Sequence, residues 1–227
     1  MPVNDMEPWL AHNREVLETA YLAKTEPWAQ SGMSGPFERW AALRKTVADC
    51  MDRDGTFLDI GCANGYLLEC CVMWAAERDV RIEPFGVDLS EKLIGLAQER
   101  LPENQDNFWT ANAFDWMPPR RFTFVRTDLV YAPAELEGAY VRHLLAHFVE
   151  PGGRLLIANY SEGRPDPEHG LLPGQHPTRF LLERLQTLGI SVSGYQDGFD
   201  KVTSKGGQTR VALVEPEKAD GKGTMNL

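Results

Sequence analysis

The chain has 227 residues, of which 43% are hydrophobic and 25% charged, the composition of one globular domain of the larger α/β size. Its formal net charge is −10, so a phosphate backbone would be repelled and we expect no nucleic-acid partner. The sequence has neither an apolar run long enough to span a bilayer nor the basic and apolar regions of a signal peptide, so we expect no membrane association.

None of the cysteines has the spacing of a disulfide framework or a zinc site. Cys50, Cys62, Cys70 and Cys71 include no C-x-x-C pair. We therefore expect reduced, buried thiols, as in a cytoplasmic protein.

Two helices are predicted ahead of the first strand. Residues 7–23 carry apolar side chains at three- and four-residue steps, which is the pattern of an amphipathic helix. Residues 24–36 contain prolines and glycines that predict a loop, and a second helix is expected over residues 37–51.

Residues 56–68 (TFLDIGCANGYLL) have the sequence of a short buried strand, a tight turn and the start of a helix. Gly61 and Gly65 can adopt positive φ and leave room for a ligand against the backbone, and Ala63 is nearly as small. Asp59 stands before the turn, where a carboxylate repels a pyrophosphate and favours a ligand with an ammonium and a sulfonium.

The sequence Asp59-Ile-Gly61-Cys-Ala63-Asn-Gly65 resembles the first motif of class I S-adenosylmethionine-dependent methyltransferases, an acid followed by three spaced glycines. Ala63 stands where the middle glycine is usual. The resemblance implies an α/β fold with a Rossmann-like, seven-stranded, mostly parallel sheet, an antiparallel last strand and helices on both faces. It also implies S-adenosyl-L-methionine as the cofactor, with Asp59, Gly61, Cys62, Ala63 and Gly65 in contact with it.

The same resemblance implies a division of the chain. Residues 1–52 would form an N-terminal helical lid, residues 53–216 the S-adenosylmethionine-binding domain, and residues 217–227, which are polar, a flexible tail. Tyr21 and Trp28 are candidates to contact the cofactor or the acceptor, and packing of the extension onto the core is the alternative.

The second strand is expected over residues 82–89 and brings Asp88 and Leu89 to the ligand. A carboxylate at the end of this strand can accept hydrogen bonds from both ribose hydroxyls. Capping of the next helix, over residues 90–100, is the alternative for Asp88, and both roles can hold together.

A third strand over residues 107–111 precedes Asn112, Ala113 and Phe114. In the family that the motif resembles, this position holds the adenine. The amide oxygen of Asn112 can accept a hydrogen bond from the exocyclic amine, as the more usual aspartate does.

The fourth strand, over residues 122–129, ends at Asp128, and Tyr131 follows. Ligands of open α/β sheets bind outside the carboxyl ends of the strands, so both residues should face the transferred methyl group. Tyr131 is a candidate to orient the acceptor. The Asn/Asp-Pro-Pro-Tyr box of many base-directed methyltransferases is missing at this position.

The last third of the chain continues the α/β pattern. A helix is expected over residues 134–149, a Pro-Gly-Gly turn over 150–154, and a strand over 155–160, and the turn is a further point of resemblance. A helix over residues 178–188 and two strands, over 190–195 and 208–215, complete the predicted sheet.

The irregular loop over residues 161–177 is predicted to bind the acceptor, because loops of this length within a domain are usually functional or disordered. His169 and His176 lie in it. Their ordinary pKa suits proton removal near neutral pH, so both are candidate general bases. We assign no metal ligands.

Methyl transfer from a sulfonium is an in-line displacement, for which the protein aligns the acceptor and excludes water. We predict transfer to an oxygen or nitrogen atom of a small-molecule acceptor, by a monomer or homodimer. The alternatives are an NAD(P)-dependent oxidoreductase, which Asp59 and the β-rich C-terminal pair argue against, and a methyltransferase-like protein that binds without turnover.

Overall fold

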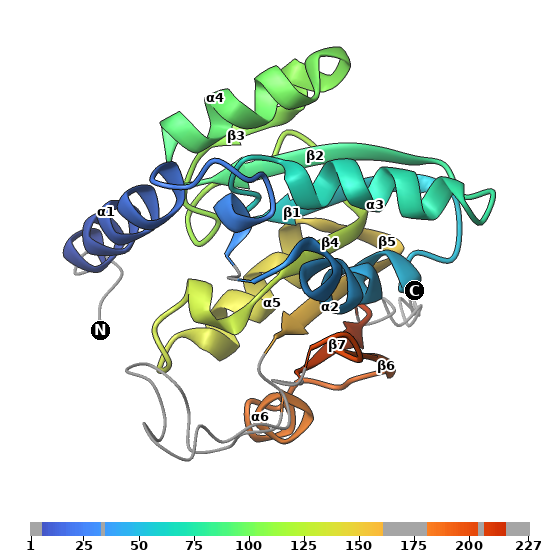
Figure 1. Cartoon of the computed structure of the whole chain (residues 1–227). Helices are drawn as coiled ribbons and strands as arrows, with labels where there is room; N and C mark the ends of the chain where they lie inside the picture. Colours follow the sequence, from blue (N-terminus) through green and yellow to red (C-terminus); the bar gives the residue numbers. More distant parts are fainter. Residues whose placement is uncertain (1–5, 33–34, 161–180, 204–206, 217–227) are drawn as a thin grey trace, which may run out of the picture.

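The computed structural model describes residues 6–32, 35–160, 181–203 and 207–216, in which a seven-stranded sheet lies between two layers of helices (Figure 1). The order across the sheet is β3-β2-β1-β4-β5-β7-β6. The strands are β1 (Gly55–Ile60), β2 (Ile82–Asp88), β3 (Phe108–Thr110), β4 (Phe122–Thr127), β5 (Val149–Asn159), β6 (Gly194–Phe199) and β7 (Gln208–Val214). Strands β1 to β5 pair in parallel and β7 pairs antiparallel with both β5 and β6, which confirms the predicted fold class.

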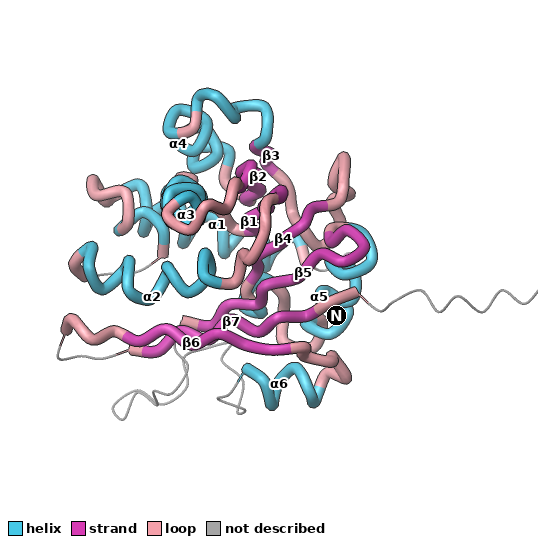
Figure 2. Tube along the Cα trace, turned by 90° about the vertical axis from the view of Figure 1, so that its right-hand side faces the viewer, coloured by secondary structure: helices cyan, strands magenta, loops and turns pink. Residues whose placement is uncertain are grey.

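The helices cover both faces of the sheet (Figure 2). One face is covered by α2 (Phe37–Asp49), α3 (Tyr66–Ala76) and α4 (Glu91–Arg100), and the other by α5 (Glu137–His147) and α6 (Leu181–Thr187). Helix α1 (Glu7–Leu22) lies outside these layers, beside α4.

Side chains alternate between the two faces along each strand, as the period of a β-strand requires. In β1, Phe57 packs toward α2 and α3, whereas Leu58 and Ile60 pack toward α5. Asp59 therefore shares the α2 face with Phe57. The same alternation assigns Arg126 of β4 to the α2 face, because Phe124 packs there.

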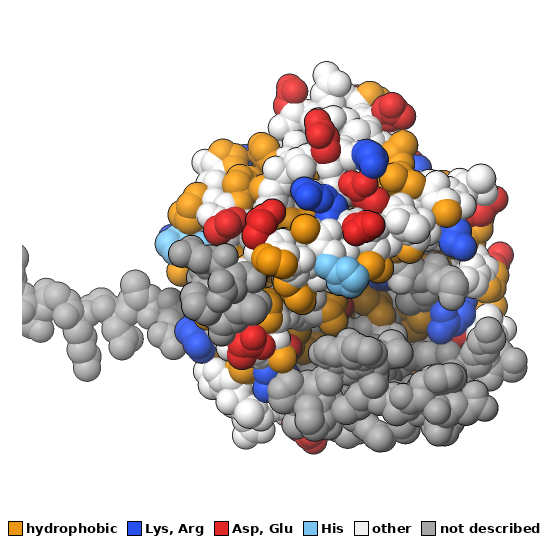
Figure 3. Space-filling view, turned by 90° about the vertical axis from the view of Figure 1, so that its left-hand side faces the viewer, with side chains coloured by type: hydrophobic (Ala, Val, Ile, Leu, Met, Phe, Trp, Pro, Cys, Tyr) orange, Lys and Arg blue, Asp and Glu red, His pale blue; other side chains and the backbone are white. Residues whose placement is uncertain are grey.

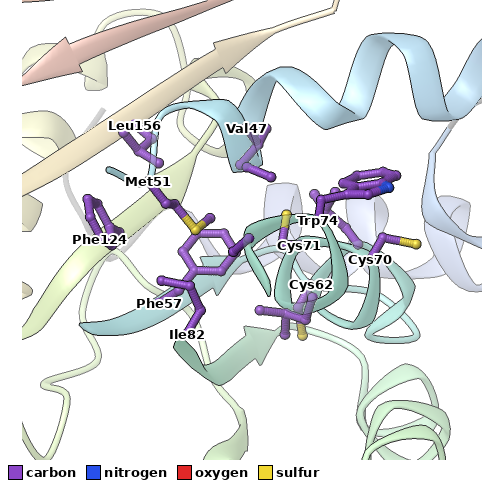
Figure 4. Packing of buried hydrophobic residues seen from close by; sticks show 14 of the residues in the cluster. Val47, Met51, Phe57, Cys62, Cys70, Cys71, Trp74, Ile82, Phe124 and Leu156 are labelled. Carbon is purple, nitrogen blue, oxygen red and sulfur yellow. The ribbon is translucent and has the colours of Figure 1, made fainter. Parts of the chain in front are cut away.

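The cysteines lie in the core on the α2 and α3 face. Figure 4 shows Cys62, Cys70 and Cys71 beside Phe57 and Trp74. All four cysteines are buried and free, as the sequence predicts. Burial raises the pKa of Cys62 and Cys71 well above the ordinary thiol value, so both stay protonated.

Two predicted boundaries are wrong. The predicted Pro-Gly-Gly turn lies inside β5, which pairs with β4 on both sides of a register shift between Phe122 and Phe124. The sixth strand begins at Gly194, later than expected, since its side chains are half-buried or exposed and give no apolar alternation.

The two N-terminal helices differ in how they pack. Helix α2 buries Trp40, Leu43 and Val47 and contacts α3, β6 and β7, so it is one of the layers of the fold. Helix α1 has no buried residue, and Glu18 ties it to α4 through Ser90 and Lys92. We therefore restrict the proposed lid to α1.

Replacing Trp40 by alanine is expected to destabilise the protein by about 3–5 kcal/mol, the usual result of emptying a buried tryptophan site. Trp40 is 1% exposed, its ring lies 5.0 Å from that of Tyr66, and its Nε1 donates to Ser31. Urea unfolding measures the loss. Phe199→Ala is the control, because Phe199 is 49% exposed, and equal losses from the two substitutions would contradict this packing.

Candidate functional site

Two adjoining cavities, each of about 200 Å³, lie where the parallel strands end. This is the edge at which ligands bind in open α/β sheets. Both cavities are bounded by the same five residues, and we call this boundary the junction: Leu17, Gly61, Asp88, Val130 and Tyr131. A single extended ligand could therefore occupy both.

The first cavity is mainly apolar, and we call it the apolar cavity. Besides the junction it is lined by α1, by the ends of β1 and β2, by the segment after β3 and by α5: Trp9, Asn13, Ile60, Val87, Leu89, Ala111, Asn112, Ala113 and Tyr140. Asn112 accepts a hydrogen bond from the Phe114 N–H at 3.1 Å, and its amide oxygen keeps a second lone pair.

The second cavity contains five ionisable carboxyl and guanidinium groups, and we call it the charged cavity. Besides the junction it is lined by Tyr21, Ser31, Gly32, Arg44, Asp59, Cys62, Ala63, Leu67, Arg126, Asp128 and Tyr160. Its walls come from α1, the segment before α2, α2 itself, the start of α3, and the ends of β1, β4 and β5.

The turn after β1 approaches its neighbours closely. Gly61 has φ +72°, and a Cβ there would lie 2.6 Å from Cζ of Tyr131, so only glycine fits. Ala63 has φ +49°, and its N–H donates to Oδ2 of Asp88 at 2.9 Å. Gly65 begins α3 and packs on Ala97 rather than lining a cavity.

Asp88 lies at the junction with both carboxylate oxygens oriented by the backbone. Oδ1 accepts from the Ser90 N–H at 3.0 Å, and Oδ2 accepts from Ala63. Burial raises the pKa of Asp88, and these N–H groups oppose the rise. Ser90, not Asp88, caps α4 through the Leu93 N–H, so the carboxylate keeps lone pairs for a ligand.

Asp59 is already paired. Its Oδ1 accepts from Nη1 of Arg126 at 3.0 Å, and the side chains are 1% and 4% exposed. The two residues are register partners on β1 and β4. Burial raises the pKa of Asp59 and the guanidinium opposes that rise, so the carboxyl group is not a free anion for a ligand.

Arg126 also holds Tyr131. Its Nη1 donates to the Tyr131 hydroxyl oxygen at 3.1 Å and to the Ile60 carbonyl at 3.2 Å. Burial raises the pKa of Tyr131 far above its ordinary value, so the phenol is neutral and its O–H is a donor. Tyr131 can orient a ligand but is not a general base.

Asp128 is the more accessible carboxylate beside this pair. Its Oδ1 accepts from the Val130 N–H at 3.1 Å, and the residue is half-buried, whereas Asp59 is buried. Burial raises its pKa and Arg126 opposes the rise. Together with Asp88, it gives the charged cavity two carboxylates that no described side chain pairs within 4 Å.

A sequence profile described as "Methyltransferase domain" matches residues 34–176, which is more than half of the chain. The chain belongs to this family. No curated protein sequence matches it.

The fold of this chain is similar to those of several proteins of known structure. The 1,6-didemethyltoxoflavin-N1-methyltransferase of Burkholderia thailandensis has a TM-score of 0.63 at 16% identity, over 95% of this chain and 92% of that one. The N-methyltransferase NodS of Bradyrhizobium japonicum WM9 has a TM-score of 0.59 at 15% identity, over 88% and 97%. The [4+2]-cyclase SpnF has a TM-score of 0.55 at 16% identity, over 76% and 79%.

Several predicted site residues of this methyltransferase domain do not reach either cavity. Trp28 packs on Phe37 with ring centroids 5.6 Å apart, and Phe114 stacks on Tyr140, whose own side chain lines the apolar cavity. His169 and His176 lie outside the described residues.

Sequence reasoning missed other cavity residues, namely Trp9, Asn13 and Leu17 of α1 and Arg44, Arg126 and Tyr160 around the charged cavity. Arg126 gave a usable signal, since it is a cation within an otherwise apolar and threonine-containing strand. Arg44 is one of two arginines on its helix, and only tertiary contacts decide which of them reaches the cavity.

The described surface shows no strong charge segregation on the α1 side. Acidic, basic and apolar side chains are interspersed there (Figure 3). Within the described ranges, no helix has the length and apolar character needed to cross a membrane, and no three His, Cys, Asp or Glu side chains group as metal ligands would.

Breaking the buried ion pair is expected to destabilise the methyltransferase domain. Asp59→Asn leaves Arg126 buried without its counter-ion, which typically costs about 3–5 kcal/mol. Asp59→Leu combined with Arg126→Met removes both charges and should cost less than the sum of the single changes. Urea unfolding of Asp59→Leu, Arg126→Met and the double variant gives the coupling energy between the two side chains.

The matched control is Asp54→Asn, which breaks the exposed Asp54–Arg81 pair and should change the free energy of unfolding far less, because water already screens this pair. If the double variant lost as much free energy of unfolding as the two single variants together, the ion pair would not couple Asp59 to Arg126.

Proposed function

We propose that this chain transfers the methyl group of S-adenosyl-L-methionine to an oxygen or nitrogen atom of a small-molecule acceptor. The observation that carries the proposal is the pair of joined cavities at the strand ends, one apolar and one charged. When bound, S-adenosylmethionine supplies an electrophilic methyl group on a sulfonium.

The two cavities match the two halves of that cofactor. The apolar cavity, with Asn112 for an amine and Asp88 for ribose hydroxyls, suits an adenosine. The charged cavity suits an amino acid. Because the sulfur joins the two halves covalently, Gly61 and Tyr131 at the junction are the residues expected to contact it.

The charges favour a cationic ligand over a pyrophosphate. Asp59 is neutralised by Arg126, and Asp88 and Asp128 remain as carboxylates near the turn. A pyrophosphate on Gly61 would lie close to both, which is repulsive in a crevice of low dielectric. Asp128 is our candidate to accept from the ammonium group.

The main contribution of the described residues would be to position the acceptor and to exclude water, and not to transfer protons. Tyr131 is held by Arg126 with its O–H available to donate, so it can fix the acceptor in line with the methyl group. Helix α1 brings Trp9 and Leu17 over the cavities, where apolar side chains exclude water. His169 and His176 stay candidate general bases.

A small acceptor is supported by one of the relatives of known structure. The toxoflavin-type methyltransferase was crystallised with 1,6-didemethyltoxoflavin and S-adenosylhomocysteine, and its name states N-methylation. The second candidate function is binding of the cofactor without methyl transfer. It is supported by the cyclase, whose similar fold carries a different activity.

Asp88→Ala is expected to weaken S-adenosylhomocysteine binding by about 1–3 kcal/mol, because it removes charge-assisted bonds to the ribose and releases the Ala63 N–H. Isothermal titration measures the change. Glu91→Ala, an exposed change in the same segment, is the control. Unchanged affinity of Asp88→Ala would remove Asp88 from the ribose site.

Ligand-induced stabilisation separates the candidate cofactors. S-adenosylmethionine at 100 times its Kd should add about 2.7 kcal/mol to the free energy of unfolding and raise the Tm, whereas NAD(H) and NADP(H) should not. A rise with a nicotinamide cofactor alone would favour the oxidoreductase. Transfer of a labelled methyl group across an acceptor panel tests turnover, and binding without any product would favour the non-catalytic alternative.

A further inference from the structure

Helix α1 is held beside the cavities by little apolar packing. No residue within the helix is buried, and none of its side chains packs on the hydrophobic core of either face of the sheet. Met6, just before the helix, is buried but also lies outside both of these cores. A segment with so few buried apolar contacts can open locally at a low free energy.

Cavities lie along most of α1. Besides the apolar and charged cavities, the helix borders a third one, of about 210 Å³. The helix residues that line this third cavity are Glu7, Leu10, Ala11 and Arg14. At the other end of the helix, Tyr21 lines the charged cavity. Few packed side chains would therefore be displaced if α1 moved.

Glu18 makes the hydrogen bonds that tie α1 to the rest of the domain. Its Oε1 accepts from the Ser90 hydroxyl at 2.8 Å, and its Oε2 accepts from Nζ of Lys92 at 2.7 Å. The Glu18 side chain is 20% exposed. Among the described residues, no other side chain of α1 forms a hydrogen bond outside the helix.

Ser90 joins this contact to the ligand site. Its Oγ, which donates to Glu18, accepts from the Leu93 N–H in the first turn of α4. Its own N–H donates to Oδ1 of Asp88 at 3.0 Å. One buried serine therefore contacts both α1 and the carboxylate proposed for the ribose.

The segment that follows α1 is anchored separately. Nδ2 of Asn64, in the glycine turn, donates to the Pro27 carbonyl at 3.1 Å and to Oε1 of Gln30 at 2.9 Å. The Asn64 side chain is buried. Since this anchor does not involve Glu18, release of Glu18 would let α1 pivot about residues 22–26.

We propose that Glu18 is the latch of a lid formed by α1, and that cofactor exchange requires its bonds to Ser90 and Lys92 to break. The proposal rests on the proposed function in taking the cavities beside α1 as the cofactor crevice. Trp9 and Leu17 line this crevice, so a bound ligand contacts the closed lid and favours it. Glu18 lines neither of these two cavities, so it is a positioning residue.

Hydrogen exchange of the ligand-free protein tests the latch alone. In Glu18→Ala, the amides of residues 7–22 should exchange roughly three- to tenfold faster than in the wild-type protein, as expected for lost hydrogen bonds. The amides of α2 should not change. Lys92→Met should give a smaller increase, because the Lys92 side chain is 68% exposed and its ion pair is screened by water.

Glu15→Ala is the matched control, since Glu15 is exposed, lies three residues earlier on the same helix and should leave the exchange of α1 unchanged. Urea unfolding of each variant checks that the core folds. Wild-type exchange of α1 in Glu18→Ala, or an equal increase in Glu15→Ala, would overturn the proposal.

Release of S-adenosylhomocysteine, followed by stopped flow, tests whether the lid controls exchange. Its rate should rise roughly three- to tenfold in Glu18→Ala and stay at the wild-type value in Glu15→Ala. Bound ligand should also slow the hydrogen exchange of α1 in the wild-type protein. An unchanged rate of release in Glu18→Ala would overturn the proposal even if α1 exchanged faster.

Failure of the proposed function gives a different result. If neither S-adenosylmethionine nor S-adenosylhomocysteine binds the wild-type protein, the cavities are not a crevice for this cofactor. Hydrogen exchange of the free protein would still decide whether Glu18 holds α1 in place.

Discussion

The buried ion pair between Asp59 and Arg126 is the constraint on which the crevice depends. This buried pair links the carboxyl ends of β1 and β4, because the two residues are register partners whose side chains lie on the same face of the sheet. From this position Arg126 also holds Tyr131 against Gly61. The ion pair, the glycine turn and the tyrosine are thus one connected unit at the sheet edge.

This unit also sets the charge of the site. With Asp59 neutralised, the preference for a cation rests on Asp88 and Asp128 instead of on the acid of the first motif. Arg44 adds a guanidinium to the lining of the same cavity. Carboxylates and a guanidinium in one cavity are what a zwitterionic amino-acid group requires.

The sequence was informative where local chemistry decides the structure. The strand, turn and helix over residues 56–68, and Asp88 at the end of the second strand, follow from periodicity and glycine sterics, and the structure has them as expected. Arg126 was missed although a cation within an otherwise apolar strand is a usable signal, whereas Arg44 was missed because its place at the cavity depends on which face of α2 meets the sheet. The start of β6 was misplaced for a similar reason, since an edge strand with exposed side chains carries little periodic signal.

A structure of the protein crystallised with S-adenosylhomocysteine would test the central claim most directly, namely that the two cavities form one cofactor crevice. We expect adenine density beside Asn112, ribose hydroxyls at Asp88, and the sulfur at the junction against Gly61 and Tyr131. Density for the ligand elsewhere, or both cavities empty at saturating ligand, would contradict it.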